Sequence, residues 1–293
     1  MATPTSPLRC LVLALLAATL PARADEAPFA SNAEAERAVR ALLVASPYKM
    51  SERARAGTIR YTFEHTASGT TGDWPETGEQ HVEIRGDRVT LTVCADCGRE
   101  AAPSAAELQR YLAANAWVDS DDRAIRAFAR GATGASVDSR MSALVLAVQK
   151  HMSGAIDFRR YATATEAFAS REGDCTEFAV LLAAAARARG IPARVVAGLV
   201  YDSRFLGRSH AFGPHTWVQV WTGQRWRSYD AALGRFDAGH VALRVGDGSP
   251  QETYGVMRRI STLRIVDAVG LPPPPAGDGS GRITDSVPTT PER

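Results

Sequence analysis

The sequence predicts an α+β fold in which a buried helix packs on an antiparallel sheet, with a small N-terminal β layer in front. Residues 175–189, CTEFAVLLAAAARAR, are apolar nearly all round and are followed by Gly190, as expected for a buried helix. Strand-like runs follow over 193–231, and a separate strand and hairpin pattern occupies 58–94. This order of helices and strands favours an α+β architecture.

The first 24 residues have the pattern of a secretory signal. Arg9 provides the positive charge, residues 11–20 form an apolar core, and the small-x-small sequence ARA at 22–24 is typical of a cleavage site. A core of ten residues is too short to span a bilayer, so we expect no transmembrane anchor. Cys10 precedes the apolar core, whereas a lipoprotein cysteine would follow it. These features predict a periplasmic or secreted protein with a signal peptide at 1–24.

Charge and composition exclude several classes of protein. The chain has 34 Lys and Arg against 32 Asp and Glu, and removal of the signal would leave 32 against 32. A near-neutral chain without a basic stripe predicts no nucleic-acid partner. Residues 271–293 are rich in Pro, Gly, Ser and Thr, which predicts a disordered tail. About 245 residues remain, enough for one core with a smaller appended layer.

The N-terminal part, residues 25–116, is expected to contain a helix and an antiparallel β layer. Residues 31–56 have a helical pattern, and 58–65 alternates like a strand. Residues 80–94 resemble a hairpin that turns at 86–87.

The rest of the chain is predicted to be helical first and then mainly strand. Apolar residues recur at helical spacing in three segments, which are 104–112, 121–131 and 138–152, and a short helix is expected near 164–170. After the helix at 175–189, strands are expected at 193–201, 215–222 and 225–231, and a further strand pair at 240–245 and 260–268.

The strands at 215–222 and 225–231 are joined by Gly223 and Gln224. Glycine at the first central position favours a type II′ hairpin turn, which sets residue 217 opposite residue 230. His215 and Asp230 then share one face as diagonal neighbours, roughly 7–8 Å apart and within reach of each other's side chains. A register slip of one residue would separate them.

Cys175 lies at the predicted start of the buried helix. Asp174 is a good N-cap and Glu177 follows three residues later, which is close to a capping box. Cys175 would then occupy the first helical position, where the positive helix end lowers the pKa of a thiol. We therefore expect the neighbouring acids to act as caps.

These segments resemble the bacterial transglutaminase-like superfamily of papain-like cysteine acyltransferases and hydrolases. The resemblance rests on GDC at a helix start, GIPAR after the helix, HTW on a strand and an aspartate on the next strand. It is strong over 165–235 and weaker over 117–164, and it implies a catalytic domain at 117–270. It also implies a triad with Cys175 as nucleophile, His215 as base and Asp230 as the residue that orients His215.

The implied activity is thiol-dependent acyl transfer on amide bonds of a peptide or protein substrate, with the cell envelope as one source. We favour hydrolysis over transfer to an amine and expect no cofactor and no metal. The Cys175 backbone N–H is the expected oxyanion donor. The second donor is unassigned because 153–174 contains no Trp or Gln, and Trp117 is a distant candidate. The alternative is a non-catalytic module of the same fold for cell-envelope binding or assembly.

Each candidate residue has a plainer alternative. Cys175 could be an unreactive buried cysteine, since cysteine is among the most buried residue types. His210 is the rival base and Asp237 the rival orienting acid. Three tryptophans that share a hairpin face are treated as core residues, namely Trp217, Trp221 and Trp226.

Cys94 and Cys97 form a C-x-x-C pair for which three interpretations are open. A short disulfide is favoured in an oxidising compartment. A zinc half-site would need two more ligands, for which His65 or His81 could only be guessed. A redox-active pair is disfavoured because no helix start or thioredoxin-like context surrounds it.

Overall fold

The computed structural model describes residues 29–65, 73–152, 155–159 and 161–271. The predicted signal at 1–24 lies outside these residues, and so does nearly all of the predicted tail. Within the described residues, no helix combines the length and the apolar character needed to cross a membrane.

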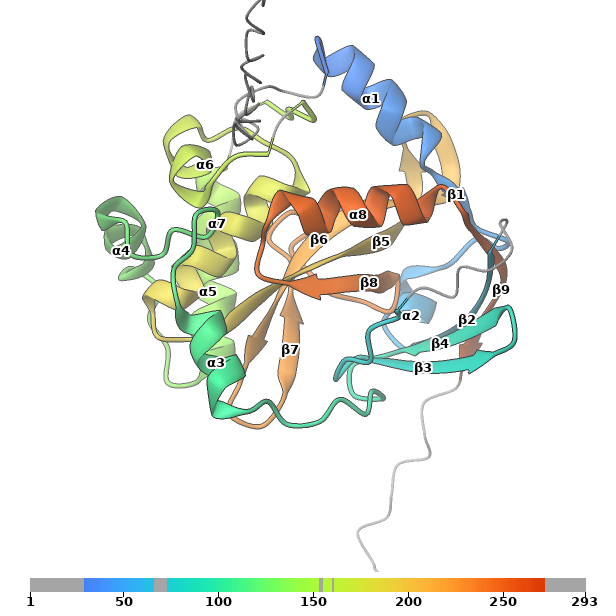
Figure 1. Cartoon of the computed structure of the whole chain (residues 1–293), viewed down its shortest axis with the longest axis horizontal. Coiled ribbons are helices and arrows are strands. Elements are labelled where there is room, and N and C mark those ends of the chain that lie inside the picture. The colour runs from blue at the N-terminus through green and yellow to red at the C-terminus, as the bar shows by residue number, and fades with distance from the viewer. Residues whose placement is uncertain (1–28, 66–72, 153–154, 160, 272–293) are drawn as a thin grey trace, which may run out of the picture.

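Two antiparallel sheets form the frame of the molecule, as the α+β prediction requires (Figure 1). The larger sheet has the order β1-β6-β5-β8, and β7 pairs with the end of β6. Its strands are β1 (Val44–Ala45), β5 (Ala193–Phe205), β6 (Arg208–Trp221), β7 (Trp226–Tyr229) and β8 (His240–Gly246). The smaller sheet has the order β3-β4-β2-β9 and consists of β2 (Thr58–His65), β3 (Gln80–Arg85), β4 (Arg88–Val93) and β9 (Leu263–Leu271).

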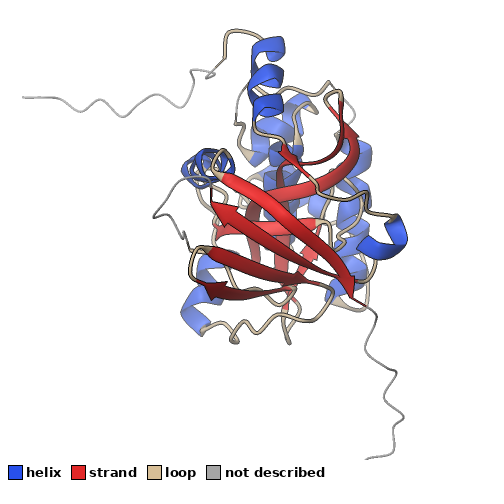
Figure 2. Ribbon diagram, turned by 90° about the vertical axis from the view of Figure 1, so that its right-hand side faces the viewer, coloured by secondary structure: helices blue, strands red, loops and turns tan. Residues whose placement is uncertain are grey.

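Helices cover one side of the larger sheet and the smaller sheet lies on the other (Figures 1 and 2). The central helix is α7 (Cys175–Ala188), which contacts β5 and β6. Three helices surround it, namely α4 (Arg123–Ala129), α5 (Val137–His151) and α6 (Ala164–Ser170). The remaining helices are α1 (Asn32–Ala41), α2 (Glu52–Arg55), α3 (Ala105–Leu112) and α8 (Pro250–Ile260).

Alanines allow α7 to be buried so deeply. Ala183, Ala184, Ala185 and Ala186 are fully buried between the sheet and the neighbouring helices. Small side chains permit this close approach, and the helix ends where Gly190 adopts a positive φ of 71°. The core around α7 therefore holds the helix start in a fixed position.

Several predicted elements differ from the observed ones. The single helix expected over 31–56 is wrong, because the chain forms α1, the short strand β1 and α2, with Pro47 between the last two. The strands expected at 240–245 and 260–268 both form, but they do not pair with each other. β8 pairs with β5 and β9 pairs with β2, so the C-terminal end completes the N-terminal β layer. Helix α8 was not predicted.

The hairpin of β5 and β6 is also longer than predicted. It turns at Leu206 and Gly207, which have φ of 46° and 74°, and the strands pair from Ala193 to Phe205. His210, which precedes the strand predicted at 215–222, lies in β6.

Candidate active site

Cys175 is the first residue of α7, and the predicted capping box is confirmed. The Thr176 N–H donates to Oδ1 of Asp174 at 2.8 Å, and the Asp174 N–H donates to Oε2 of Glu177 at 2.9 Å. The other Glu177 oxygen accepts the Ala162 N–H at 2.8 Å. Both acids therefore accept backbone hydrogen bonds that fix the helix start.

Gly173 is required immediately before this cap. Its φ is +147°, and a Cβ atom added there would lie 2.5 Å from the Glu177 side chain. Any other residue would therefore displace the carboxylate that closes the capping box.

The thiol pKa differs from the expectation based on the helix dipole. Burial, and then the charge of Asp174, raise the pKa of Cys175 well above its ordinary value, although the Thr216 backbone N–H lowers it. Burial also raises the pKa of Glu177 well above its ordinary value. The net shift is therefore opposite to the one expected from the helix start alone, because burial and the neighbouring carboxylates disfavour a thiolate.

The predicted hairpin register is confirmed. Val218 lies opposite Tyr229 and Trp221 opposite Trp226, the register that sets 217 opposite 230. His215 and Asp230 lie on one side of this hairpin, with Nε2 of His215 2.7 Å from Oδ2 of Asp230. Both residues are buried, with 6% and 1% of their surfaces exposed.

Asp230 is held on both of its oxygens. Oδ1 accepts the N–H groups of Ala232 at 2.8 Å and Leu233 at 3.0 Å. Oδ2 accepts from His215 and from Nε2 of His240 at 3.1 Å. Burial raises the pKa of Asp230, but its electrostatic interaction and hydrogen bond with His215 and its hydrogen bond with His240 outweigh burial and hold this pKa well below its usual range.

His240, at the start of β8, is the site residue that the sequence analysis missed. Its Nδ1 lies 3.4 Å from Oδ1 of Asp237, and Arg55 pairs with the other Asp237 oxygen at 2.6 Å. Hydrogen bonds to Asp230 and Asp237 raise the pKa of His240 to about 9, against the effect of its burial. No local pattern reveals this residue, because β8 reaches Asp230 only through its pairing with β5.

His215, Asp230 and His240 offer three potential metal-ligand atoms within 4.8 Å of one another. The spacing from His215 to Asp230, 2.7 Å, is that of a charge-assisted hydrogen bond. Two ligands at about 2.0–2.1 Å from a tetrahedral zinc ion would lie farther apart. We therefore describe the cluster as a hydrogen-bonded network.

The rival residues have other partners. Nδ1 of His210 lies 2.8 Å from the Tyr201 hydroxyl, and His210 is not among the described residues that line the cavity at Cys175. Asp237 contacts Arg55 and His240. Trp117 packs edge-on against Tyr161 and is likewise outside that lining, which contains no Trp or Gln among its described residues.

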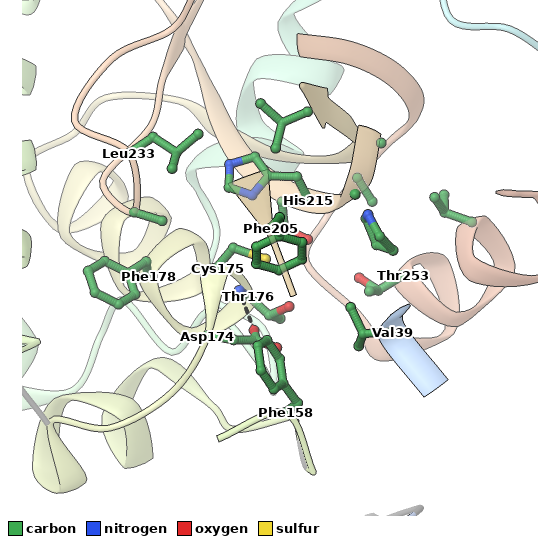
Figure 3. A pocket seen from close by; sticks show the side chains of 18 of the residues that line it. Val39, Phe158, Asp174, Cys175, Thr176, Phe178, Phe205, His215, Leu233 and Thr253 are labelled. Carbon is green, nitrogen blue, oxygen red and sulfur yellow. Dashed lines mark hydrogen bonds between the residues drawn. The ribbon is translucent and has the colours of Figure 1, made fainter. Parts of the chain in front are cut away.

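Cys175 and His215 line one cavity of about 290 Å³. Figure 3 shows both near its centre, with Phe178 and Leu233 on one side and Val39 and Thr253 on the other. Asp230 lies behind His215, away from the cavity lining. This arrangement places a thiol and an imidazole in one cavity, with a carboxylate bonded to the imidazole.

Residues of the N-terminal β layer form hydrogen bonds with the β6–β7 hairpin, which carries His215. Glu79 is buried and accepts the Ser228 N–H at 3.0 and 3.1 Å and the Gln219 side-chain amide at 3.3 Å. Arg194 donates to Gln219 and forms a bidentate pair with Glu100, at 2.6 and 2.7 Å. Between β4 and Glu100 lie Cys94 and Cys97, which form a disulfide with Cα atoms 5.7 Å apart.

Residues 122–231 match the model of the transglutaminase-like superfamily. The chain matched none of the curated proteins with which it was compared.

The chain is similar to several solved structures, of which three are described here. The periplasmic domain of TgpA from Pseudomonas aeruginosa is 16% identical with a TM-score of 0.44, over 78% of this chain and 96% of that one. A candidate cysteine protease from Cytophaga hutchinsonii is 18% identical with a TM-score of 0.43, over 72% and 84%. Red sea bream transglutaminase is 10% identical with a TM-score of 0.34, over 61% and 47%. These likenesses are too distant to carry a functional argument.

The match to the superfamily model spans α4 to the end of the β6–β7 hairpin and includes Cys175, His215 and Asp230. Residues 122–231 of the chain therefore form a transglutaminase-like domain.

Proposed function

We propose that the protein is a cysteine-dependent hydrolase of amide bonds, with Cys175, His215 and Asp230 as its catalytic triad. The observation that supports this most strongly is the buried hydrogen bond from His215 to Asp230, beside a cavity that His215 shares with Cys175. Nucleophile, base and orienting acid are the three parts that thiol acyl chemistry needs. The catalytic domain is proposed at 117–270.

In the proposed reaction the thiol is protonated at rest, because burial raises its pKa. Nε2 of His215 is hydrogen-bonded to Asp230. Nδ1 of His215 is therefore free to take the thiol proton as the sulfur attacks the substrate carbonyl. A carbon–sulfur bond forms, and the carbonyl oxygen becomes an oxyanion. The Cys175 N–H, in the first turn of α7, has no partner within the helix and donates to this oxyanion.

The tetrahedral intermediate then loses the amine. His215 gives its proton to the amine nitrogen as the carbon–nitrogen bond breaks, which leaves a thioester on Cys175. Water attacks the thioester with His215 again as base, and the products are a carboxylic acid and the free thiol. Transfer to a second amine would differ only in this last acceptor.

We place this reaction outside the cytoplasm, in the periplasm or the medium, because residues 1–24 have a signal pattern and the chain contains a disulfide. Peptides or proteins, including those of the cell envelope, are the proposed substrates.

The test is cleavage of a synthetic peptide library by the full mature chain, read by mass spectrometry. Cys175→Ala and His215→Ala are expected to lose roughly 10⁴-fold or more in rate. His210→Ala is the matched control, since it removes a histidine from the same strand outside the cavity lining. Equal cleavage by the wild type and Cys175→Ala would refute the proposal.

A non-catalytic module that binds the cell envelope is the second candidate. It is favoured by the raised thiol pKa and by a cavity lining without Trp or Gln among its described residues. It predicts that no peptide is cleaved and that Cys175→Ala leaves binding to isolated envelope unchanged.

A further inference from the structure

The cavity beside Cys175 is larger than a site for the scissile amide alone requires. Its volume of about 290 Å³ is nearly twice that of a cavity of ~150 Å³ that accommodates benzene. The extra room corresponds to one large side chain next to the reacting carbonyl.

The walls of this cavity are mostly apolar. They include Val39, Phe158, Val200, Phe205, Leu233 and Val256. Figure 3 shows several of these side chains, contributed by separate elements around Cys175. An apolar group that enters would exchange water for hydrocarbon contacts on several sides.

The charged groups of the lining do not offer a partner to an acidic substrate. Its described residues include no Lys or Arg, and the two carboxylates are those of Asp174 and Asp202. Asp174 accepts the Thr176 N–H, and Asp202 accepts the Arg204 N–H at 2.9 Å. A carboxylate placed here would lose its hydration and face negative charge.

Part of the wall comes from outside the matched segment. Val39 belongs to α1, and Val256 and Met257 belong to α8, whereas the superfamily match covers only 122–231. The shape of the cavity therefore depends on segments outside the matched residues 122–231.

We propose that this cavity is a specificity pocket for a large apolar side chain, aromatic or branched aliphatic, in the residue that flanks the scissile amide. The inference rests on the proposed function and adds the class of substrate. Val39 and Val256 are then specificity-determining residues, positioned by α1 and α8.

The experiment compares peptides that differ at one position flanking the cleaved bond, with Phe, Leu, Ala or Glu there. Burial of a large side chain should favour Phe or Leu over Ala by roughly 10- to 100-fold in kcat/KM. Glu should be the poorest of the four. The variation is made separately on the acyl and amine sides, and a preference on either side supports the proposal.

Val256→Phe fills the pocket from α8 and is expected to shift the preference toward Ala. Arg258→Phe is its matched control, since it adds the same side chain to an exposed position of the same helix and should keep the wild-type preference. Because Val256 also contacts the core, a second variant is made at Val39, which is half-buried on α1. Val39→Asp should lower kcat/KM specifically for the Phe and Leu peptides.

The outcomes separate the two proposals. Cys175-dependent cleavage with equal rates for Phe, Ala and Glu peptides, or a preference for Glu, would overturn the pocket and leave the proposed function standing. Absence of any Cys175-dependent cleavage would overturn the proposed function together with the pocket.

Discussion

Replacing His240 with glutamine tests the buried network behind His215. In the wild type, hydrogen bonds to Asp230 and Asp237 raise the pKa of His240 to about 9, from an ordinary value of 6.5. Glutamine keeps an N–H donor for Asp230 and cannot take a proton, so the variant removes the charge while it preserves much of the shape.

The pKa shift determines the sign of the effect on stability. A histidine whose pKa is raised by folding stabilises the fold fully below its unfolded value of about 6.5, and this contribution is lost as the pH rises through about 9. Each pKa unit corresponds to about 1.4 kcal/mol, so the contribution is on the order of 3 kcal/mol. The free energy of unfolding of the wild type should therefore exceed that of His240→Gln mainly at low pH.

The assay is urea unfolding at about pH 5.5 and pH 9.5, followed by circular dichroism. The gap in stability between the wild type and His240→Gln should be roughly 3 kcal/mol at the lower pH and should largely close at the higher one. His81→Gln, which removes a histidine that contacts neither Asp230 nor Asp237, controls for other effects of the substitution. An equal gap at both pH values would refute the assignment of a buried charged His240.

Three further predictions follow from the site. Asp230→Asn keeps the shape but removes the charge that orients His215, so kcat should fall by roughly 10³- to 10⁴-fold, and a loss below tenfold in steady-state assays would contradict this role. Alkylation of Cys175 by iodoacetamide should rise only above the ordinary thiol pKa of about 8.5, because burial raises its pKa, and rapid alkylation at pH 6 would show a preformed thiolate. Glu79→Ala leaves the buried Ser228 N–H without its acceptor and should cost about 1–3 kcal/mol in urea unfolding, whereas Glu79→Gln, which keeps an acceptor oxygen, should cost less.

Local patterns in the sequence account for the parts of the site that were predicted. The capping box at Asp174 and Glu177 depends on residues three apart in one helix turn. The hairpin register depends on two residues, Gly223 and Gln224, and it was enough to bring His215 and Asp230 to one side. Such features are set by backbone geometry within a few residues.

The parts that were missed depend on contacts between distant segments. His240 reaches Asp230 through the pairing of β8 with β5, and β9 joins the N-terminal sheet across nearly the whole chain. The net direction of the Cys175 pKa shift also depends on desolvation of the thiolate, which is set only in the completed fold. Neither the partner of a strand nor the desolvation of a thiolate can be predicted from one local segment of the sequence.

The central claim is that Cys175 attacks an amide carbonyl with His215 as its base. Its most direct test is mass spectrometry of the full mature chain, quenched in acid within milliseconds to seconds of mixing with a cleaved peptide. The account predicts an acyl group on the peptide that contains Cys175 in the wild type, greatly reduced in His215→Ala and present in His210→Ala. Cleavage without any acyl-Cys175, or acyl-Cys175 formed equally fast in His215→Ala, would contradict the account.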